Sequence, residues 1–385
     1  MSCNWEMIPL GELITLQRGH DLPSSKRAEG CIPIMGSSGI TGYHNKAKCI
    51  GEGVIVGRSG NSMGEVSFVD EDYWPLNTCL YVTDFKGNDP KYIYYLLKTV
   101  NFDQFNSGSA QKSLNRNAVY PFEVHATRNK EVQREVGNCL SRIESKVTLN
   151  IQTNQTLEEM AQAIFKSWFV DFDPVKAKLN GEQPKGMDAA TASLFPEKLV
   201  ESELGLIPDG WKVKPFSEWV KITKGKNITK KTIVEGDVPV VAGGLKPAYF
   251  HNAHNVNGPA ITISASGANA GYVNLYFENI WASDCSYISQ SATPMFFLQY
   301  VALRYNQKKI FDMQTGAAQP HIYPRDFERL MVAVPNEELC RKLEDVFSSF
   351  FGTIANNKQQ NIELAALRDM LLPKLLSGEI ELEVR

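Results

Sequence analysis

Short apolar runs separated by glycine, proline and asparagine occupy two regions of the chain, residues 51–70 and 257–278. Runs of this length between turn-forming residues are typical of strands and hairpins. Each region is followed by a stretch rich in aromatic and aliphatic residues, 90–100 and 294–306, whose spacing predicts a short helix. The pattern therefore predicts two small α+β domains with glycine-rich connecting loops.

A different pattern follows each of these domains. In residues 129–178 and 336–379 apolar residues recur at alternating spacings of four and three, which places them along one stripe of a helix and favours coiled-coil pairing. This stripe, the seam, comprises Val136, Leu140, Ile143, Val147, Asn150, Asn154, Leu157, Ala161, Ile164 and Trp168, and then Leu343, Phe347, Phe350, Ile354, Asn357, Asn361, Leu364, Arg368, Leu371 and Leu375. We expect two helices of about 40 residues, each about 60 Å long.

The second half of the chain repeats the landmarks of the first in the same order. The repeated pairs are Trp5 and Trp211, Pro9 and Pro215, Gly19 and Gly225, Gly60 and Gly267, Gly64 and Gly271, Trp74 and Trp281, Gly108 and Gly316, Ala110 and Ala318, and Gln111 and Gln319. Chance identities would not keep one order over so many blocks, so we infer a tandem duplication. The expected organisation is a first domain (1–128), a long helix (129–178), a connector (179–207), a second domain (208–335) and a second long helix (336–379).

Two asparagines lie at the midpoint of each seam, Asn150 with Asn154 and Asn357 with Asn361. If the two helices pair, these amides meet, and buried asparagine specifies register at some cost in stability. The alternative is that they face solvent in a frayed middle. Two-fold symmetry between the repeats would make the pairing antiparallel and would place the two domains at opposite ends of the helix pair.

Prolines and glycines recur throughout residues 173–211, between the first helix and the second domain. They forbid one continuous helix there. We expect a packed connector in which residues 189–195 form one or two helical turns.

Composition indicates an ordinary folded protein of 385 residues, 43% hydrophobic and 22% charged, with a net charge of −3. That charge argues against nonspecific coating of nucleic acid but leaves room for local basic surfaces. The cysteines show no zinc-binding spacing, which favours reduced thiols. Neither a signal peptide nor an apolar run of membrane-spanning length is present, so we place the chain in the cytoplasm, away from membranes.

No sequence motif of catalysis occurs in the chain. A phosphate-binding GxxxxGK[ST] loop, HExxH, GxSxG and the NPPY-like tetrapeptide of amino-methyltransferases are all missing. The histidines are dispersed, and the carboxylate pairs lie on or beside the predicted helices. We therefore expect a binding protein without catalytic residues and without a metal or cofactor of its own.

The loops of both domains carry side chains suited to DNA. Arginine and lysine can read guanine, asparagine and glutamine can read adenine, and lysines can contact phosphates. The candidate DNA-binding residues are Arg18, Lys26, Arg58, Ser59, Asn61, Lys112, Asn115 and Arg116 in the first domain, and Lys224, Lys226, Lys230, Lys231, Ser266, Asn269, Gln319, His321, Tyr323 and Arg325 in the second. Any one of them alone would be read as an ordinary surface residue; their recurrence in both domains favours the DNA interpretation.

Residues 156–178, 186–211 and 367–380 closely resemble the central and C-terminal conserved regions of the specificity (S) subunits of type I restriction-modification enzymes. The segment from Trp5 to Leu13, and its repeat at Trp211, resemble the start of a target recognition domain. The resemblance covers nearly the whole chain. It implies an α+β fold in which two homologous target recognition domains are separated by two long antiparallel coiled-coil helices with pseudo-two-fold symmetry.

The resemblance also implies partners. Each domain would read one half of a bipartite, asymmetric site on double-stranded DNA, and the helices would fix the gap and dock methyltransferase (M) subunits, two per chain. The docking residues expected on this basis are Phe165, Trp168, Phe169, Leu372 and Leu376. S-adenosylmethionine, ATP and Mg would be bound by the M subunits and by restriction (R) subunits, which methylate adenine and cleave DNA.

Two other interpretations remain open. One is an enzyme with a cryptic nuclease or methyltransferase centre, which turnover by the purified chain would reveal. The other is a structural scaffold whose domains bind protein, which would bind no duplex even with an M partner present.

Overall fold

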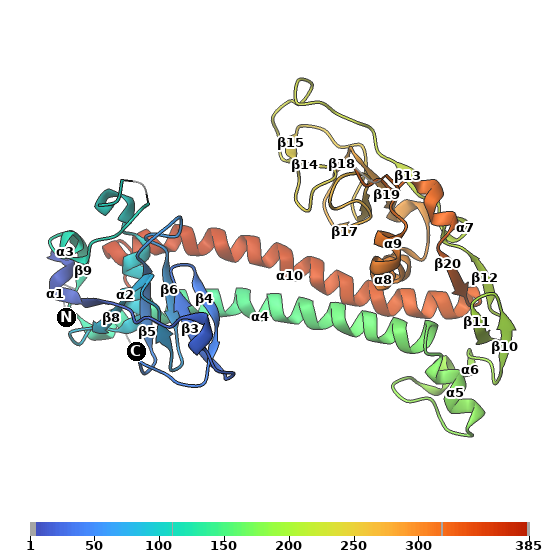
Figure 1. The fold of residues 1–385 in the computed structure, drawn as a ribbon, viewed down its shortest axis with the longest axis horizontal. Helices are drawn as coiled ribbons and strands as arrows, with labels where there is room; N and C mark the ends of the chain where they lie inside the picture. The colour runs from blue at the N-terminus through green and yellow to red at the C-terminus, as the bar shows by residue number, and fades with distance from the viewer. Residues whose placement is uncertain (1–4, 110, 317–318, 383–385) are drawn as a thin grey trace. The chain divides into compact units, whose positions relative to one another are not determined.

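The computed structural model describes residues 5–109, 111–316 and 319–382; the repeated pair Ala110 and Ala318 lies outside them. Two compact units make up the chain (Figure 1): unit 1 comprises Met1–Asn150 and Gln359–Arg385, and unit 2 comprises Ile151–Lys358. Helix α4 (Lys130–Phe169) and helix α10 (Glu337–Ser377) each contribute one part to unit 1 and the other part to unit 2. Each unit thus combines one α+β domain with a stretch of both long helices.

The strands of the first domain form three sheets, the pair β1–β9, a four-stranded sheet in the order β2-β8-β5-β6 and a three-stranded sheet in the order β4-β3-β7. The pairing is antiparallel except between β3 and β7. The strands are β1 Trp5–Pro9, β2 Thr15–Arg18, β3 Ile32–Gly36, β4 Gly39–His44, β5 Gly53–Gly57, β6 Val66–Val69, β7 Trp74–Pro75, β8 Cys79–Asp84 and β9 Glu123–Thr127. The helices are α1 Leu10–Leu13, η1 Ser24–Lys26, α2 Pro90–Lys98, η2 Phe102–Phe105 and α3 Arg116–Val119.

The second domain repeats this topology with β12–β20, β13-β19-β16-β17 and β15-β14-β18. Here too the short strand joins its three-stranded sheet in parallel, β14 with β18. The strands are β12 Lys212–Pro215, β13 Thr223–Lys224, β14 Val238–Val241, β15 Tyr249–His251, β16 Ala260–Ser264, β17 Val273–Tyr276, β18 Trp281–Ala282, β19 Cys285–Ser289 and β20 Met331–Val334; the helices are α7 Phe216–Trp219, η3 Gln290–Ala292, α8 Phe296–Tyr305, α9 Gln307–Asp312 and η4 Pro324–Glu328. The duplication in the sequence is therefore a duplication of the fold.

Two of the repeated glycine pairs have a conformational reason to recur. Gly60 and Gly267 have φ angles of 78° and 79°, and Gly64 and Gly271 have 87° and 84°. A side chain is strained in this left-handed region, so glycine is favoured at the same turn in both domains.

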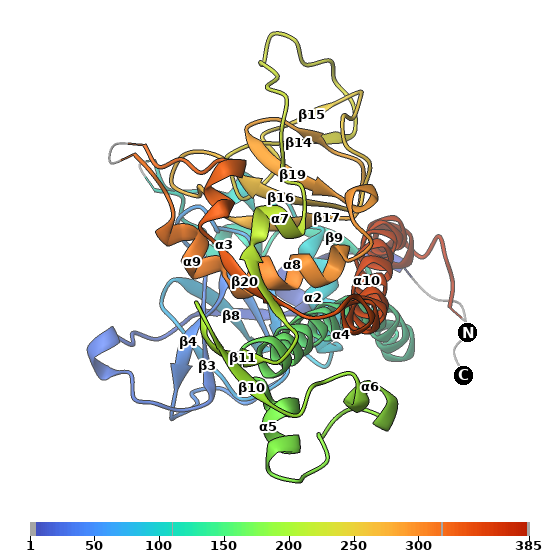
Figure 2. The same cartoon turned by 90° about the vertical axis from the view of Figure 1, so that its right-hand side faces the viewer.

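In each unit the domain helix packs between its four-stranded sheet and the long helices. In unit 2 the core joins Ile263 of β16, Val301 of α8 and Phe347 of α10, all of them buried, and Figure 2 shows α8 below the sheet, above α4 and beside α10. In unit 1 the core likewise joins β5, α2, the start of α4 and the end of α10. The apolar stripes of the helices are thus covered by the domains as well as by each other.

Both long helices begin after an asparagine at equivalent positions. The Asn129 side chain accepts a hydrogen bond from the Glu131 backbone N–H (3.0 Å), and the Asn336 side chain accepts one from the Leu339 N–H (2.9 Å), which caps the exposed donors of a helix N-terminus. Every seam position is buried or half-buried.

The first long helix is shorter than the predicted segment 129–178. It ends at Phe169, and a separate helix, α5 (Asp173–Leu179), follows. Phe172 has a φ of 56°, and Pro174 supplies no backbone donor, so the helix cannot continue through this point. In α10, by contrast, Pro373 lies within the helix near its end.

The connector contains α6 (Ala189–Ser193), within the expected residues 189–195, and its N-cap Asp188 accepts from the Thr191 N–H. It also contains an antiparallel hairpin of β10 (Leu199–Ser202) and β11 (Gly205–Pro208). The sequence did not predict this hairpin, because its strands are only four residues long.

Candidate nucleic-acid interface

In the first domain two loops distant in sequence lie side by side. The Gly60 N–H donates to the Lys112 carbonyl (3.1 Å), and the Leu114 N–H donates to the Arg58 carbonyl (2.8 Å). Ser59 and Ser113 form the β-bridge between these contacts. These residues, 58–60 with 112–114, form the paired loops of the first domain.

The second domain builds the same arrangement from the equivalent residues. The Gly267 N–H donates to the Pro320 carbonyl (3.0 Å), the Ile322 N–H donates to the Ala265 carbonyl (3.0 Å), and Ser266 bridges His321. Because these contacts join backbone groups, the loops keep the same pairing although their side chains differ. Residues 265–267 with 320–322 are the paired loops of the second domain.

Beside the second paired loops, the ring of Tyr323 gathers predicted site residues. Lys224 Nζ lies 5.8 Å and the Arg325 guanidinium 5.7 Å from the centroid of the Tyr323 ring, within the range of a cation–π interaction. The ring of His321 stacks on the ring of Tyr323 at 5.9 Å with an interplanar angle of 10°. Lys224 and Arg325 are exposed, so the cluster presents two cations and a polar aromatic surface to solvent.

The basic side chains in and next to the first paired loops have partners within the first domain. Lys112 forms an ion pair with Asp103 at 2.6 Å. Arg58 donates to the Asn77 carbonyl at 3.4 Å, and Arg116 donates to the Leu16 carbonyl at 3.0 Å. Since both partners of the Lys112 pair are about half exposed, the pair is weak and can open when a phosphate competes.

The structure brings together some predicted DNA-binding residues and leaves others apart. Arg18 lies on β2, Lys26 in η1, and Lys226, Lys230 and Lys231 in the segment after β13, all outside the paired loops. The exposed members of the set are Arg18, Lys26, Asn61, Lys112, Asn115, Arg116, Lys224, Lys226, Lys230, Lys231, Gln319 and Arg325; the half-buried members are Arg58, Ser59, Ser266, Asn269, His321 and Tyr323.

Three of these residues make hydrogen bonds within the chain. Asn115 caps α3 by accepting from the Asn117 N–H (3.0 Å). The backbone carbonyl of Asn269 closes a turn with the Tyr272 N–H (2.9 Å). The Ser266 hydroxyl donates to Asp284, which leaves its lone pairs as acceptors for a ligand.

Asp284 was missed by the sequence analysis. It lies beside Ser266 at the second paired loops, where a carboxylate can accept a hydrogen bond from the amino group of cytosine or adenine. The sequence signal that could have identified Asp284 is its position three residues after Trp281, the repeat of Trp74.

The predicted helix-pairing asparagines contact one another in two pairs. In unit 1 the Asn150 side chain donates to Asn361 (2.9 Å) and to Gln360 (2.8 Å). In unit 2 the Asn357 side chain donates to Asn154 (2.9 Å). Asn150 and Asn154 are buried, so the alternative of solvent-facing asparagines does not describe them.

Three of the five predicted docking residues are buried in the core of their own unit. Phe165 and Phe169 are stacked at 4.9 Å in the core of unit 2, and Leu376 is buried in the core of unit 1. Phe165, Phe169 and Leu376 are 4%, 6% and 4% exposed. Only Trp168 and Leu372 are half-buried.

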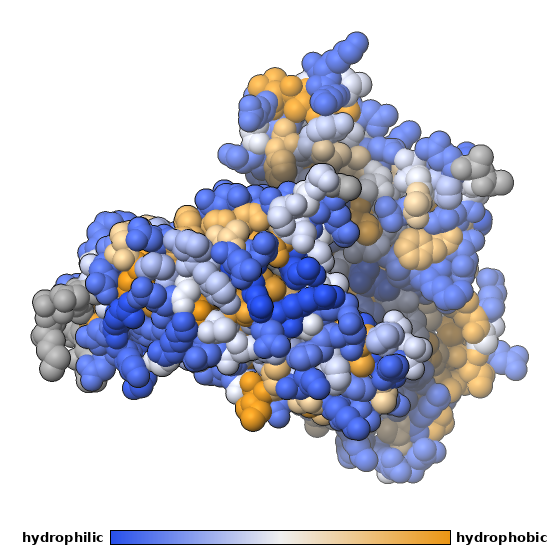
Figure 3. Space-filling view, turned by 60° about the vertical axis from the view of Figure 1, so that its left-hand side comes forward, coloured by the Kyte–Doolittle hydropathy of each residue, from blue (hydrophilic) through white to orange (hydrophobic). Residues whose placement is uncertain are grey.

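Within the described residues, no helix combines the length and apolar character needed to cross a membrane. The histidine, cysteine and acidic side chains in the part of the chain that the structure describes form no group of three or more that would hold a metal ion. The face drawn in Figure 3 is largely hydrophilic, with apolar side chains in small patches.

The duplicated fold agrees with comparisons to known proteins. A family described as type I restriction modification DNA specificity domain matches twice, at residues 3–159 and 208–366. The chain belongs to this family. Each match covers one α+β domain and part of the long helix that follows it, so the chain carries two DNA specificity domains.

Two relatives are named as specificity subunits. The type I restriction enzyme HindI specificity subunit of Haemophilus influenzae is 26% identical over 84% of this chain and 85% of its own length. The type I restriction enzyme MjaIX specificity subunit of Methanocaldococcus jannaschii is 25% identical over 76% of this chain and 69% of its own length.

The fold is also that of a solved member of the family. The type I restriction-modification system S subunit from M. genitalium superposes with a TM-score of 0.67, covers 97% of this chain and 96% of its own length, and is 19% identical. Similarity at this level establishes the common architecture, two α+β domains with long helices, and says nothing of individual contacts.

Proposed function

We propose that this protein is the noncatalytic specificity subunit of a type I restriction-modification system and that it reads a bipartite, asymmetric sequence on double-stranded DNA. The observation that carries the proposal is the recurrence of the paired loops. The same backbone contacts hold residues 58–60 to 112–114 and residues 265–267 to 320–322. Two domains with the same fold and with loops held in the same way are suited to recognise two short DNA segments.

The two readers differ in chemistry, so their half-sites differ in sequence. Arg58 of the first paired loops corresponds to Ala265 of the second, and Lys112 corresponds to Pro320. The second domain instead offers Tyr323 with two cations, Lys224 and Arg325. Cationic side chains contact phosphates or guanine, whereas Ser266 and Asp284 suit amino groups at base edges.

The long helices fix the gap between the half-sites and dock two M subunits. Met160 on α4 and Leu367 on α10 support this, since they occupy equivalent positions of the two repeats and are 44% and 39% exposed. An exposed apolar side chain at the equivalent position of each repeat is suited to contact two copies of the same partner, one at each repeat. In this proposal they add exposed apolar surface to the expected docking residues Phe165, Trp168, Phe169, Leu372 and Leu376.

The assembled complex would act in the cytoplasm. The M subunits would bind S-adenosylmethionine and methylate adenine, and R subunits would use ATP and Mg to cleave DNA. This chain would determine which DNA sequence the complex recognises.

Methylated adenines in the genome of the source cell, mapped with and without the gene for this chain, test the proposal. We expect a two-part motif whose methylation disappears on deletion and returns when the gene is restored. Lys224→Ala with Arg325→Ala should weaken methylation, and Lys185→Ala, at an exposed position of the connector, should not. An unchanged methylation map after deletion would refute the proposal.

A further inference from the structure

We propose that the two long helices carry two chemically different sockets, one for each α+β domain, so that the domains cannot be exchanged. A socket is here the pair of helix residues that contacts the domain helix: Gly137 and Glu144 of α4 for α2, and Glu344 and Phe351 of α10 for α8. Gly137 and Glu344 occupy equivalent positions of the repeat, as do Glu144 and Phe351. Each socket lies within one unit.

The second socket caps the domain helix from outside. In the described part of the chain, the N-cap residue of α8, Met295, makes no side-chain hydrogen bond to the helix. Instead the Glu344 carboxylate accepts from the backbone N–H groups of Phe297 (3.1 Å) and Leu298 (2.9 Å). Glu344 is only 9% exposed, and burial raises its pKa, an effect that these two N–H donors oppose. An acidic group at this place satisfies donors that α8 leaves open.

At the position equivalent to Glu344 the first socket has Gly137, which carries no side chain. Helix α2 is capped by its own N-cap residue, Asp89, which accepts from the Tyr92 N–H at 3.0 Å. Gly137 of α4 passes so close that a Cβ there would lie 3.0 Å from Asp89 Oδ1 and 3.0 Å from the Tyr92 nitrogen. Glycine inside a helix lowers stability. The close approach of α2 is the physical reason that α4 has glycine at position 137.

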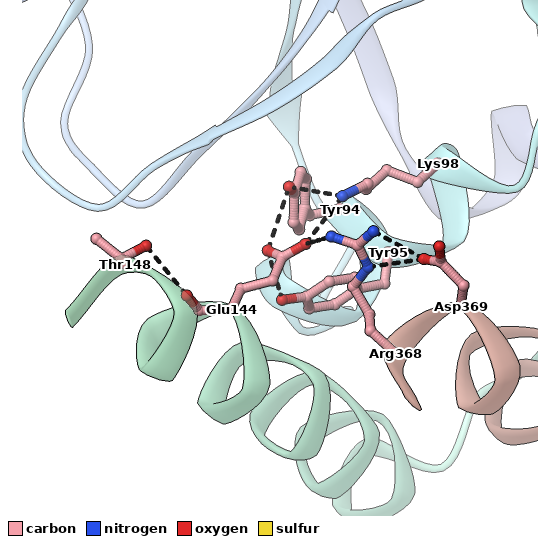
Figure 4. Close-up of polar contacts among 7 residues, drawn as sticks. All are labelled: Tyr94, Tyr95, Lys98, Glu144, Thr148, Arg368 and Asp369. Atoms are coloured by element: carbon pink, nitrogen blue, oxygen red, sulfur yellow. Dashed lines mark hydrogen bonds and ion pairs between the residues drawn. The ribbon is translucent and has the colours of Figure 1, made fainter. Parts of the chain in front are cut away.

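The second position of the sockets differs just as much. In unit 1 Glu144 accepts from the Tyr95 hydroxyl (2.9 Å) and pairs with Lys98 Nζ (2.9 Å), and Arg368 of α10 approaches it at 3.5 Å (Figure 4). In unit 2 the equivalent Phe351 stacks on Phe297, with ring centroids 5.1 Å apart and an interplanar angle of 9°. A polar cluster thus holds α2 where aromatic packing holds α8.

Exchanging the domains would mismatch both positions. The first domain on the second socket would bring Asp89 against the buried Glu344, and Tyr95, which is 1% exposed, would face Phe351 without an acceptor. The second domain on the first socket would leave the N-terminus of α8 facing Gly137 and would set Phe297 against Glu144. Like charges and unpaired buried polar groups both oppose such packing.

The sockets rest on contacts within each unit and need no DNA. Their consequence for recognition rests on the proposed function: the order in which the chain presents its two half-sites is set by the helices. A readout of folding therefore tests the sockets even if the DNA proposal fails.

The first test exchanges the domains in the full chain, residues 5–128 for 211–335 and the reverse, with and without the socket substitutions Gly137→Glu, Glu144→Phe, Glu344→Gly and Phe351→Glu. We expect the exchanged chain to melt about 10 °C or more below the parent or to fail to fold, and the socket substitutions to recover a large part of the loss. An exchanged chain as stable as the parent, or socket substitutions without benefit, would overturn the proposal.

The second test needs no exchange. Glu344→Gly is compared with Asp345→Gly, a glycine at the neighbouring exposed position of α10, so that the cost of glycine in a helix is common to both. We expect Glu344→Gly to lower the melting temperature by about 5 °C more than its control. Glu344→Gln, which keeps one acceptor, should fall between the parent and Glu344→Gly. Equal losses for Glu344→Gly and Asp345→Gly would count against the socket.

Discussion

The Asn150 side chain on α4 donates a 2.9 Å hydrogen bond to the Asn361 side chain on α10. Both residues are seam positions within unit 1, and Asn357 with Asn154 makes the equivalent contact within unit 2 (2.9 Å). Glu144 pairs with Arg368, and Asn150, later on α4, pairs with Asn361, earlier on α10. The two helices are therefore antiparallel in unit 1. Hydrogen bonds between polar side chains inside an apolar seam form in one register of the two helices and are lost in the others.

Removing one partner of such a pair should cost more than removing both. Asn154 is 8% exposed; Asn357→Leu leaves its side-chain oxygen without a donor, and we expect a loss of about 1–2 kcal/mol in the free energy of unfolding. Asn154→Leu with Asn357→Leu should recover part or all of it, because two apolar groups then face each other. Chemical denaturation measures both, with Asn356→Leu at an exposed neighbouring position as the control. Identical losses for Asn357→Leu and Asn356→Leu would mean that the pair contributes nothing.

The cations beside Tyr323 should govern the salt dependence of DNA binding. Replacing Lys224 and Arg325 with alanine removes two charges next to the second paired loops, and the slope of log K against log salt should fall by about one for each phosphate that the protein then no longer binds. Binding titrations of the complex at several salt concentrations measure the slope. Lys185→Ala should leave it unchanged, and a slope unaltered by the double substitution would remove this cluster from the interface.

The exposed apolar residues Met160 and Leu367 should be required for assembly. A charge at either position opposes apolar contact with a partner, so we expect Met160→Glu and Leu367→Glu each to lose one M subunit and the double variant to lose both. The mass of the assembled complex reports the stoichiometry. Gln152→Glu, an exposed position on α4, is the matched control. Full assembly of the double variant would exclude this docking site.

A heptad inserted into both helices should lengthen the DNA spacer. Seven residues add about 10 Å of helix, close to three base pairs at about 3.4 Å each. The insertions fall within residues 141–155 and 349–361 and keep the seam in phase. Methylation of a site library reports the tolerated spacer, and an unchanged spacer would rule out the helices as its determinant.

Two equivalent thiols should resist alkylation and weaken the fold at high pH. Burial raises the pKa of Cys79 and of Cys285 from 9.0 to about 12. Since the folded state holds a proton that the unfolded state releases, stability should fall as pH rises from about 9 to about 12. Thiol labelling followed by mass spectrometry at pH 8 should modify the exposed Cys31 and spare both buried thiols until the protein unfolds. Labelling of Cys79 at the rate of Cys31 would contradict this burial.

The seams predicted the two long helices because helical periodicity is a property of neighbouring residues. The repeated landmarks likewise predicted two copies of one fold, as the matching strand orders show. The end of α4 at Phe169 was missed because the break depends on the left-handed backbone of Phe172 together with Pro174. Apolar residues such as Phe165 and Leu376 are equally consistent with a core and with a docking surface, and the pattern alone could not separate the two.

The sequence by itself determined the duplication, the position of the helices and the side-chain types at the candidate DNA-binding loops, because each follows from local spacing or from comparing the chain with itself. Only the tertiary structure decided which loops meet, which apolar side chains are covered, and that Gly137 and Glu344 serve different domain helices. Those outcomes depend on backbone segments that lie far apart along the chain, such as Arg58 against Leu114 and Glu344 against Leu298. Contacts of this kind form only when packing brings the segments together.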